Sequence, residues 1–296
     1  TRYTCQLTDP TGYNIPTATG HIPCADLIMD SNYNELTRVK LLPYNGRTAT
    51  DPNDLDVHDF ILLGDNHYIA EAYYETVVNN IPSDLHPVPN CKVAAPIIQE
   101  VDNGSVVWEW DGANDTALYE ASQEGNTFYD STIVDDYAHL NAMIVDPKDN
   151  NLICSFRTCD QIIKIERGTG RIIWRLGGVG SDFPLTNDQQ FLRQHDISLT
   201  DNGQTLMFFD NGDSARQYSR VVEMQLDETS KTVTSFKALT LPANYYGAYQ
   251  GSVQKFNSYY FVCTGYNPYI LKTTKDAPDI LFSKRLNSVS YRAYLE

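Results

Sequence analysis

One pattern recurs along this chain of 296 residues, and it constrains the possible folds more than any other feature. His58, His139 and His195 each open an apolar run, which is followed by a polar turn and a second apolar run. A fourth copy begins at Gly251 and has no histidine; the four copies are separated by 81, 56 and 56 residues. Equivalent positions in a ring of repeats face a common axis. We therefore predict that the three imidazoles lie around one spot.

A second kind of hairpin follows each copy of this pattern. These hairpins share two apolar runs joined by a polar turn, and they cover residues 98–108, 163–174, 221–236 and 280–294. Two hairpins within about 50 residues describe a four-stranded propeller blade. Residues 12–45 hold a degenerate copy with a strand at residues 25–29, and the interval between His58 and His139 has room for further strands. The sequence predicts an all-β fold, a β-propeller of four-stranded blades that number six, with five as the alternative.

Nothing in the sequence reads as a linker between two domains, so residues 1–296 are predicted to form a single propeller domain. Residues 113–138 read as an insertion with a short helix, directly before His139. Long insertions between blades usually lie over the channel mouth, where they shape a binding site.

The charge balance excludes one class of partner. The chain has 38 acidic and 22 basic residues, for a net charge of −16, and a surface of this sign repels phosphate backbones. Nucleic acid is therefore excluded as a partner, and no apolar stretch is long enough to span a membrane. No glycine-rich loop of the phosphate-binding kind is present, so no cofactor is expected. The sequence does not predict the oligomeric state.

The six cysteines are compatible with disulfide bonds. Cys5, Cys24 and Cys91 lie in polar sequence that reads as loops and are the better candidates, whereas Cys154 and Cys263 lie on apolar strands and read as buried thiols. The chain begins at Thr1 rather than methionine, which is compatible with removal of a leader. These features predict an exported protein, extracellular or periplasmic.

Charged residues accompany the repeated histidines. Arg157 lies at the far end of the strand pair that begins at His139, and Asp210 at the far end of the pair that begins at His195. The outgoing end of a hairpin returns beside its start, so each is expected near its histidine. Three imidazoles and one guanidinium suit a tetrahedral oxyanion, because the guanidinium fork binds two oxygens at once. An imidazole can also act as a nucleophile when a neighbour fixes its tautomer.

A series of short motifs across residues 55–265 resembles the arylsulfotransferase family in order and spacing. The motifs are Val-His-Asp-Phe at 57–60, His-Leu-Asn at 139–141, Ser-Phe-Arg at 155–157, Trp-Arg-Leu-Gly-Gly at 174–178, Gln-His-Asp at 194–196, Phe-Asp-Asn at 209–211 and Ser-Arg at 219–220. The resemblance implies a six-bladed propeller that moves a sulfuryl group from an aryl sulfate to a phenol without a nucleotide sulfate donor. The chain looks closer to the compact members of the family, which lack an N-terminal sandwich domain.

The resemblance also implies roles for particular residues. His195, in the Gln-His-Asp motif, would be the nucleophile that becomes transiently sulfated. His58, His139 and Arg157 match positions that hold the sulfate oxygens or act as acid and base, and Asn141 matches the motif asparagine, which we assign to substrate binding. The implied cycle is ping-pong: the donor sulfates His195, the first phenol leaves, and an acceptor phenol takes the group.

Two tyrosines are further candidates for substrate binding. Tyr245 and Tyr249 lie just before the fourth inner strand and can stack on an aryl ring, although scattered tyrosines are common in β-proteins. Asn141 can equally cap a turn. The remaining histidines share no repeat position, and we predict surface or loop positions for His21, His67 and His86.

Structural roles compete with function for the charged residues. Arg157 can form a structural ion pair with Asp160 or Asp196. Asp196 and Asp210 can orient His195, but Asp-Asn-Gly is also common turn chemistry, so both interpretations stay open.

Two other functions fit the same sequence. One is a non-catalytic propeller that binds partners and retains a pocket for an anion or a glycan. The other is a metal-dependent hydrolase in which His58, His139 and His195 hold zinc. Arg157 argues against a metal site there, because a guanidinium repels a dication, so no metal is predicted.

Overall fold

The computed structural model describes residues 2–8, 20–47 and 55–295, and the chain divides into two compact units. Unit 1 comprises Thr1–Leu140 together with Glu166–Arg171, and unit 2 comprises Asn141–Ile165 together with Ile172–Glu296. Each unit has buried apolar clusters of its own.

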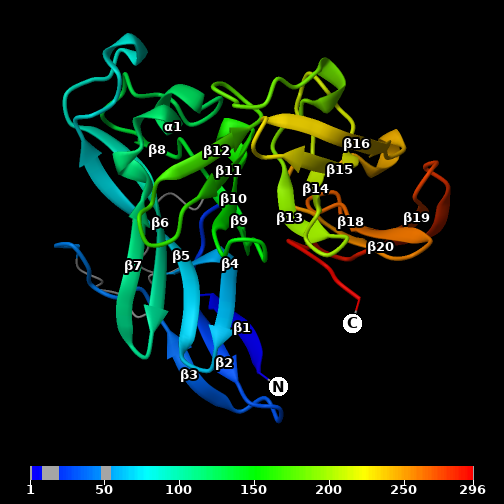
Figure 1. The fold of residues 1–296 in the computed structure, drawn as a ribbon, viewed down its shortest axis with the longest axis horizontal. Helices are drawn as coiled ribbons and strands as arrows, with labels where there is room; N and C mark the ends of the chain where they lie inside the picture. The colour runs from blue at the N-terminus through cyan, green and yellow to red at the C-terminus, as the bar shows by residue number, and fades with distance from the viewer. Residues whose placement is uncertain (1, 9–19, 48–54, 296) are drawn as a thin grey trace. The chain divides into compact units, whose positions relative to one another are not determined.

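Unit 1 is built on one eight-stranded sheet (Figure 1). Its strands are β1 (Tyr3–Thr8), β2 (Pro23–Met29), β3 (Glu35–Val39), β4 (Leu55–Gly64), β5 (His67–Val78), β6 (Cys91–Asp102), β7 (Ser105–Asp111) and β8 (Val134–Asp135). The main path runs β1-β2-β4-β5-β6-β7, β3 pairs with β2, and β8 pairs in parallel with β6. The strands β4 to β7 thus form a meander in which each strand pairs with the next.

Local sequence explains the connections in unit 1. Asn103 and Gly104 join β6 to β7, and both have positive φ (49° and 77°), which the two-residue hairpin turn requires. The expected short helix of the insertion is present as α1 (Thr116–Ala121), and the Asp115 side chain caps it by accepting the N–H of Ala117 at 3.1 Å. The 3₁₀ turns Ser83–Leu85 and Gly112–Asn114 complete the unit.

Unit 2 contains three four-stranded antiparallel sheets, each a meander of consecutive strands (Figure 1). The first has β9 (Leu140–Val145), β10 (Leu152–Phe156), β11 (Gln161–Ile165) and β12 (Ile172–Leu176). The second has β13 (His195–Thr200), β14 (Thr205–Asp210), β15 (Arg220–Asp227) and β16 (Thr232–Thr240). The third has β17 (Ser252–Lys255), β18 (Tyr259–Cys263), β19 (Tyr269–Thr274) and β20 (Ile280–Arg285). The 3₁₀ turn Arg157–Cys159 joins β10 to β11 within the first sheet, and the turns Asn187–Gln189 and Ala243–Tyr245 lie in the connections between successive sheets.

The middle sheet of unit 2 is buried on both faces. Phe208 on β14 packs in a cluster with Trp174 of the first sheet, and the adjacent Phe209 packs in a second cluster with Val262 of the third sheet. Successive side chains of a strand point to opposite faces, so one continuous apolar strand serves both interfaces. Burying an aromatic side chain of this size contributes about 1.5–3 kcal/mol.

The all-β prediction is confirmed, and so are four-stranded sheets with the predicted hairpins of residues 139–174 and 195–236. The N-terminal region differs from the prediction, because β2 pairs directly with β4 and joins the early strands to the His58 meander in one larger sheet. The last hairpin also differs, since it uses Tyr269–Thr274 with Ile280–Arg285. Part of residues 12–45 lies outside the described residues. The number of blades, ring closure and a single domain remain predictions.

The structure has no disulfide bond among the six cysteines, all of which lie in the part of the chain that it describes, so it does not bear out the disulfide prediction. Cys5 lies on β1 and Cys24 on β2, and Cys91 is the first residue of β6, so the polar sequence that reads as loops forms strands. Cys5 faces Leu27 across the ladder, and Cys24 faces Thr8 and Leu55. Cys154 and Cys263 are buried thiols, as predicted.

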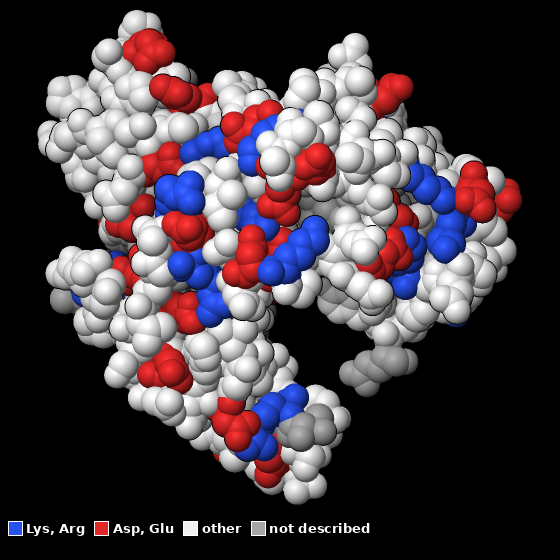
Figure 2. All heavy atoms as spheres, viewed as in Figure 1, with Lys and Arg blue, Asp and Glu red and all other residues white. Residues whose placement is uncertain are grey.

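Acidic and basic side chains are interspersed on the face of the molecule drawn in Figure 2. Among the described residues, no helix has the length and apolar character needed to cross a membrane.

The structure explains why the fourth copy of the repeat has Gly251 where others have histidine. Gly251 has a φ of 109°, and a Cβ there would lie 2.7 Å from the Phe209 ring and 2.9 Å from the Cys263 carbonyl oxygen. A side chain at this position would therefore collide with the packing between the second and third sheets.

We predict that Gly251→Ala lowers the free energy of unfolding by about 2–4 kcal/mol, measured by urea denaturation. Gly104→Ala is the matched control, because its φ is also positive (77°) but nothing lies within 4 Å of the added Cβ. The control should lose about 1 kcal/mol from backbone strain alone. Equal losses in the two variants would contradict the packing explanation.

Candidate functional site

In unit 2, hydrogen bonds fix the tautomer of His195. Its Nδ1–H donates to the Arg193 carbonyl oxygen at 2.9 Å and to Asn211 Oδ1 at 2.8 Å. On the other side of the ring, Nε2 accepts the backbone N–H of Gln250 at 3.2 Å. Two acceptors at Nδ1 and a donor at Nε2 mean that the proton is on Nδ1 and the lone pair on Nε2. His195 is 3% exposed, and its lone pair points toward the segment that precedes β17.

The two neighbours of His195 attach it to other sheets of unit 2. The buried Gln194 side chain donates to Ser155 Oγ at 3.0 Å and to the Gln161 carbonyl oxygen at 2.8 Å, on β10 and β11. Asp196 Oδ2 accepts the N–H of Val253 on β17 at 2.8 Å. The Gln-His-Asp motif therefore links three sheets, and Asp196 connects β13 to β17.

Asn211 is a residue whose role the sequence reasoning missed. Its Nδ2 donates to the carbonyl oxygens of Gly247 and Gln250, both at 2.7 Å, while Oδ1 holds His195. The expected orienting residue, Asp210, instead forms ion pairs with Arg216 and Arg220. The Phe-Asp-Asn motif, which Asn211 closes, pointed to this part of the chain. Adjacent residues of a strand point to opposite faces, however, and the sequence alone did not show whether Asp210 or Asn211 faces His195.

Arg157 and Tyr249 lie together in unit 2. The Arg157 guanidinium carbon is 5.2 Å from the centre of the Tyr249 ring, and the Arg193 carbon is 5.9 Å from it. Arg157 is 7% exposed, whereas Tyr249 is 45% exposed. Two guanidinium groups beside one half-exposed ring supply positive charge and an aromatic surface in one place.

The other two substrate-binding candidates are placed differently. Asn141 is fully buried, and its Nδ2 donates to the Gln194 carbonyl oxygen at 2.8 Å, so it supports the residue before His195. Tyr245 packs edge-on against Tyr269, with ring centres 5.1 Å apart, beside the apolar cluster of the second and third sheets.

In unit 1, the structure brings His58 and His139 together, with ring centres 4.9 Å apart. Each ring is bound through Nδ1 to a buried carboxylate: His58 to Asp56, and His139 to Asp136 at 2.5 Å. A carboxylate at Nδ1 keeps the proton there and leaves Nε2 as the nitrogen on the opposite side of the ring. The expectation that His195 and Arg157 join these histidines concerns both units and stays a prediction.

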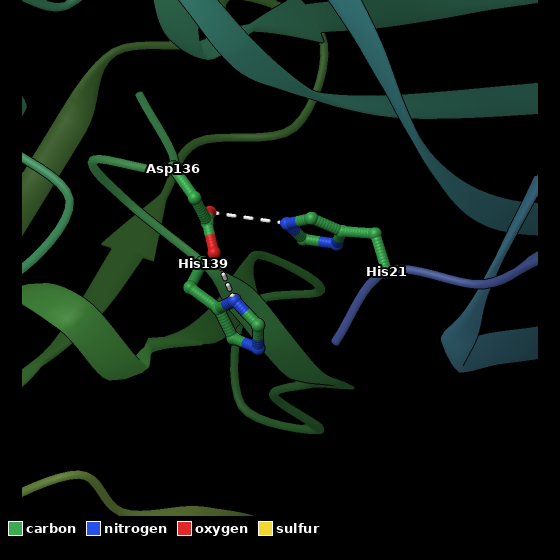
Figure 3. Close-up of side chains that lie close together, drawn as sticks. All are labelled: His21, Asp136 and His139. Carbon is green, nitrogen blue, oxygen red and sulfur yellow. Dashed lines mark hydrogen bonds and ion pairs between the residues drawn. The ribbon is translucent and has the colours of Figure 1, made fainter. Parts of the chain in front are cut away.

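His21 is a third imidazole in this cluster, and the prediction of a surface or loop position is wrong for it. The side chain is 0% exposed and packs on the Tyr73 ring, with ring centres 3.7 Å apart. Its Nε2 lies 3.0 Å from Asp136 Oδ1, and its Nδ1 lies 3.4 Å from Asp56 Oδ2. Figure 3 shows Asp136 between His21 and His139. No pattern in the sequence predicts this placement, because His21 belongs to no repeat.

The other two histidines outside the repeats lie at the surface of unit 1. His86 is exposed at the end of a 3₁₀ turn. His67 is partly exposed on β5 and bonded to Glu100 at 2.7 Å. The prediction holds for these two.

Burial and charge act in opposite directions on the groups of the unit 1 cluster. Burial lowers the pKa of His21, but Asp136 and Asp56 outweigh it and raise the pKa to about 10. For His139, burial outweighs Asp136, and the pKa falls to about 4. Burial also raises the pKa of Asp56 and Asp136, but the neighbouring histidines lower both below the usual range. The cluster therefore contains ionised carboxylates, a cationic His21 and a neutral His139 at pH 7.

The same residues are of the types that bind metal ions. His21, Asp136 and His139 offer ligand atoms within 4.8 Å of one another, and so do His21, Asp56 and His58. The Nδ1 of His139, however, is already hydrogen-bonded to its carboxylate at 2.5 Å. Two atoms that bind one zinc ion in tetrahedral geometry, each about 2.0–2.2 Å from the metal, lie farther apart than the 2.5 Å between His139 Nδ1 and Asp136 Oδ2. These two atoms are therefore too close together to bind one zinc ion.

Several residues of the candidate site have left-handed backbone conformations. These are His139, Arg193, Asp196 and Gln250, with φ of 39°, 54°, 57° and 63°. Each such residue costs about 1–3 kcal/mol, and such conformations cluster at functional sites because the surrounding structure must hold them.

Four-stranded antiparallel meanders that stack face to face define an all-β protein of the propeller-like class. One solved structure with a similar fold is provisionally assigned as a 6-phosphogluconolactonase of Bacteroides fragilis, with 11% identity, 97% of this chain and 68% of that chain covered, and a TM-score of 0.51. Another is the Cps50 (Swd1) β-propeller domain of Myceliophteria thermophila, with 9% identity, 90% and 69% covered, and a TM-score of 0.48. At these identities the likeness concerns the fold alone.

Among curated protein sequences, none matches this chain. The family model of the arylsulfotransferases (ASST) matches residues 24–281, and the chain belongs to this family. Membership supports a sulfotransferase-like enzyme that acts on aryl sulfates and phenols.

We predict that His21 makes stability decrease at alkaline pH. Its folded-state pKa of about 10 lies above the ordinary value of 6.5, so the folded state keeps a proton that the unfolded state releases. This stabilisation is fully present below pH 6.5 and is lost as the pH rises through about 10, at up to about 1.4 kcal/mol per pH unit.

Urea denaturation between about pH 7 and pH 9 measures this dependence. The free energy of unfolding of His21→Gln should fall less steeply with pH than that of the parent. His86→Gln, at an exposed histidine, should keep the parent slope. Equal slopes in the parent and His21→Gln would show that His21 does not hold the extra proton.

Proposed function

We propose that the protein transfers a sulfuryl group from an aryl sulfate to a phenolic acceptor by a ping-pong mechanism, with a sulfohistidine at His195 as the intermediate. The observation that carries this proposal is the hydrogen bonding of His195. The proton is held on Nδ1 by Arg193 and Asn211, so Nε2 has the lone pair that a nucleophile needs. Membership of the arylsulfotransferase family supports the choice of substrate.

In the first half-reaction, the hydrogen bond from the Gln250 N–H to His195 Nε2 breaks, and the lone pair of Nε2 attacks the sulfur of the donor. The bond between sulfur and the aryl oxygen breaks, and the phenolate takes a proton from an acid and leaves as the phenol. The imidazole becomes positively charged while Nε2 carries SO₃, and the acceptors at Nδ1 stabilise that charge. The backbone N–H of Gln250, 3.2 Å from Nε2 in the resting protein, is available to an oxygen of the bound sulfuryl group.

In the second half-reaction, an acceptor phenol loses its proton to a base, and its oxygen attacks the sulfur as the bond to Nε2 breaks. His139 suits the role of base, because burial keeps its pKa low and the ring neutral at pH 7. His58, with the same carboxylate arrangement, suits the role of the other proton carrier or of a donor to the sulfate oxygens.

Arg157 is assigned to the sulfate oxygens. Sulfuryl transfer, like phosphoryl transfer, places charge on peripheral oxygens in the transition state, and a preorganised cation stabilises that charge. Arg157 is nearly buried, and Tyr249 beside it offers a face for the aryl ring. Asn141 and Tyr245 are proposed to support this region rather than to touch the reacting atoms, since their contacts are with protein groups.

We predict that incubation with 4-nitrophenyl sulfate and a phenol releases nitrophenol and leaves one sulfuryl group on His195, detected by peptide mass spectrometry. His195→Ala should reduce transfer by at least about 1,000-fold, because the covalent intermediate cannot form. His86→Ala, at an exposed histidine, is the control and should transfer at the parent rate.

Three results would contradict this proposal. Transfer by His195→Ala at the parent rate removes His195 from the role of nucleophile. A parent protein that is inert with a broad panel of donors favours the non-catalytic binding protein. Loss of activity to a chelator and recovery with zinc favours the metal-dependent hydrolase.

We predict that Arg157→Lys lowers kcat/KM for the donor by about 10–100-fold, because a single ammonium cannot bind two oxygens as the fork does. The fold should be retained, which circular dichroism checks. Arg171→Lys is the control, because Arg171 is exposed and pairs with Glu166. Undiminished transfer by Arg157→Lys would move the oxyanion site to other residues.

A further inference from the structure

His21 lies outside every motif that the proposed reaction uses, yet it is completely buried. It comes from the segment before β2, whereas the two histidines of the cluster come from β4 and from the segment before β9. A buried imidazole that contacts two carboxylates has a cost in desolvation, which its contacts must offset.

Five side chains of unit 1 alternate between imidazole and carboxylate. In order of contact they are His58, Asp56, His21, Asp136 and His139. Asp136 contacts His139 through Oδ2 and His21 through Oδ1, as Figure 3 shows. Asp56 contacts His58 through Oδ1 and His21 through Oδ2. His21 is therefore the centre of a nearly symmetrical chain whose two ends are the histidines assigned to acid–base chemistry.

The position of His21 favours a cation, because both ring nitrogens lie at ion-pair distance from carboxylates and neither has, among the described residues, a hydrogen-bond partner that would need a lone pair. A carboxylate only accepts hydrogen bonds, and both nitrogens of His21 face one, at 3.0 and 3.4 Å. A lone pair on either nitrogen would face an anion at short range. The other groups that face His21 are the rings of Tyr73, His58 and His139, at centre distances of 3.7, 5.7 and 4.8 Å.

A cation between Asp56 and Asp136 has a structural consequence for the two outer histidines. It holds each carboxylate ionised and in place, and each carboxylate in turn holds Nδ1–H of its histidine. The direction of each Nε2 is then set by a side chain that does not touch the substrate. Backbone contacts add to this, since the N–H of Ile22, next to His21, donates to Asp56 Oδ2 at 3.2 Å.

We infer that His21 is a positioning residue, an imidazolium that clamps Asp56 and Asp136 and thereby fixes the tautomer and orientation of both His58 and His139. Its effect on catalysis rests on the proposed function, but the tautomers themselves do not depend on any substrate. A metal ion in the cluster is the competing explanation, and the same experiments separate the two.

The first experiment uses the unmodified protein and ¹⁵N NMR of its histidine side chains. At about pH 8, His21 should show two protonated nitrogens, and His58 and His139 should show a proton on Nδ1. A neutral His21 at this pH overturns the inference. Stoichiometric zinc or another metal in the purified protein, lost on substitution of His21, also overturns it.

The second experiment replaces His21 and follows sulfuryl transfer. His21→Gln should lower kcat by about 10–100-fold with KM for the donor changed less than about threefold, and should weaken the Nδ1–H signals of His58 and His139. His21→Lys, which keeps a cation between the carboxylates, should recover part of the loss. His86→Gln is the control and should change neither readout.

The outcomes separate a failure of this inference from a failure of the proposed function. If the parent protein transfers no sulfuryl group, the NMR signals still test the clamp. If it does transfer, unchanged Nδ1–H signals in His21→Gln overturn the inference whatever the rate. If the variants do not fold, the protonation state of His21 in the parent decides the result.

Discussion

The structure of unit 2 depends on three consecutive side chains, each hydrogen-bonded to a different part of the unit. Gln194 binds the first sheet, His195 binds Asn211 at the end of β14, and Asp196 binds β17 of the third sheet. Because these bonds are buried, breaking one leaves an unpaired polar group, which costs about 1–3 kcal/mol. His195, the proposed nucleophile, therefore has a fixed position because its neighbours also hold the sheets together.

The two units use different partners to orient imidazoles. His195 donates to neutral oxygens of Arg193 and Asn211, which fix the tautomer without adding a negative charge. His58 and His139 donate to carboxylates, which place a negative charge beside each ring. The neutral oxygens suit His195, because the proposed nucleophile must release the sulfuryl group in the second half-reaction. The carboxylates suit His58 and His139, which we propose as proton carriers. The difference also gives a physical basis for the separate roles that we propose for these histidines.

The sequence predicted the hairpins because their signals are local. Apolar runs and an Asn-Gly turn determine strands such as β6 and β7 without reference to the rest of the chain. The carboxylate partners were also within reach, because Asp56 lies two residues before His58, on the same face of the strand. His21 was not predictable, since a contact between segments far apart in sequence leaves no periodic signal. The disulfide prediction was not borne out for a related reason, because strand pairing places Cys5 opposite Leu27.

The last described residues complete the region around β9 and β13. The Tyr291 hydroxyl and the Arg292 guanidinium donate to the Asn141 carbonyl oxygen at 2.9 and 2.8 Å, and Tyr294 binds Asp196. Contacts between segments 150 residues apart close late, because the intervening chain must first be ordered. During synthesis on the ribosome, β9 and β13 emerge long before their partners. The edge of β13 that carries His195 is thus completed only after residues 291–294 have also left the exit tunnel.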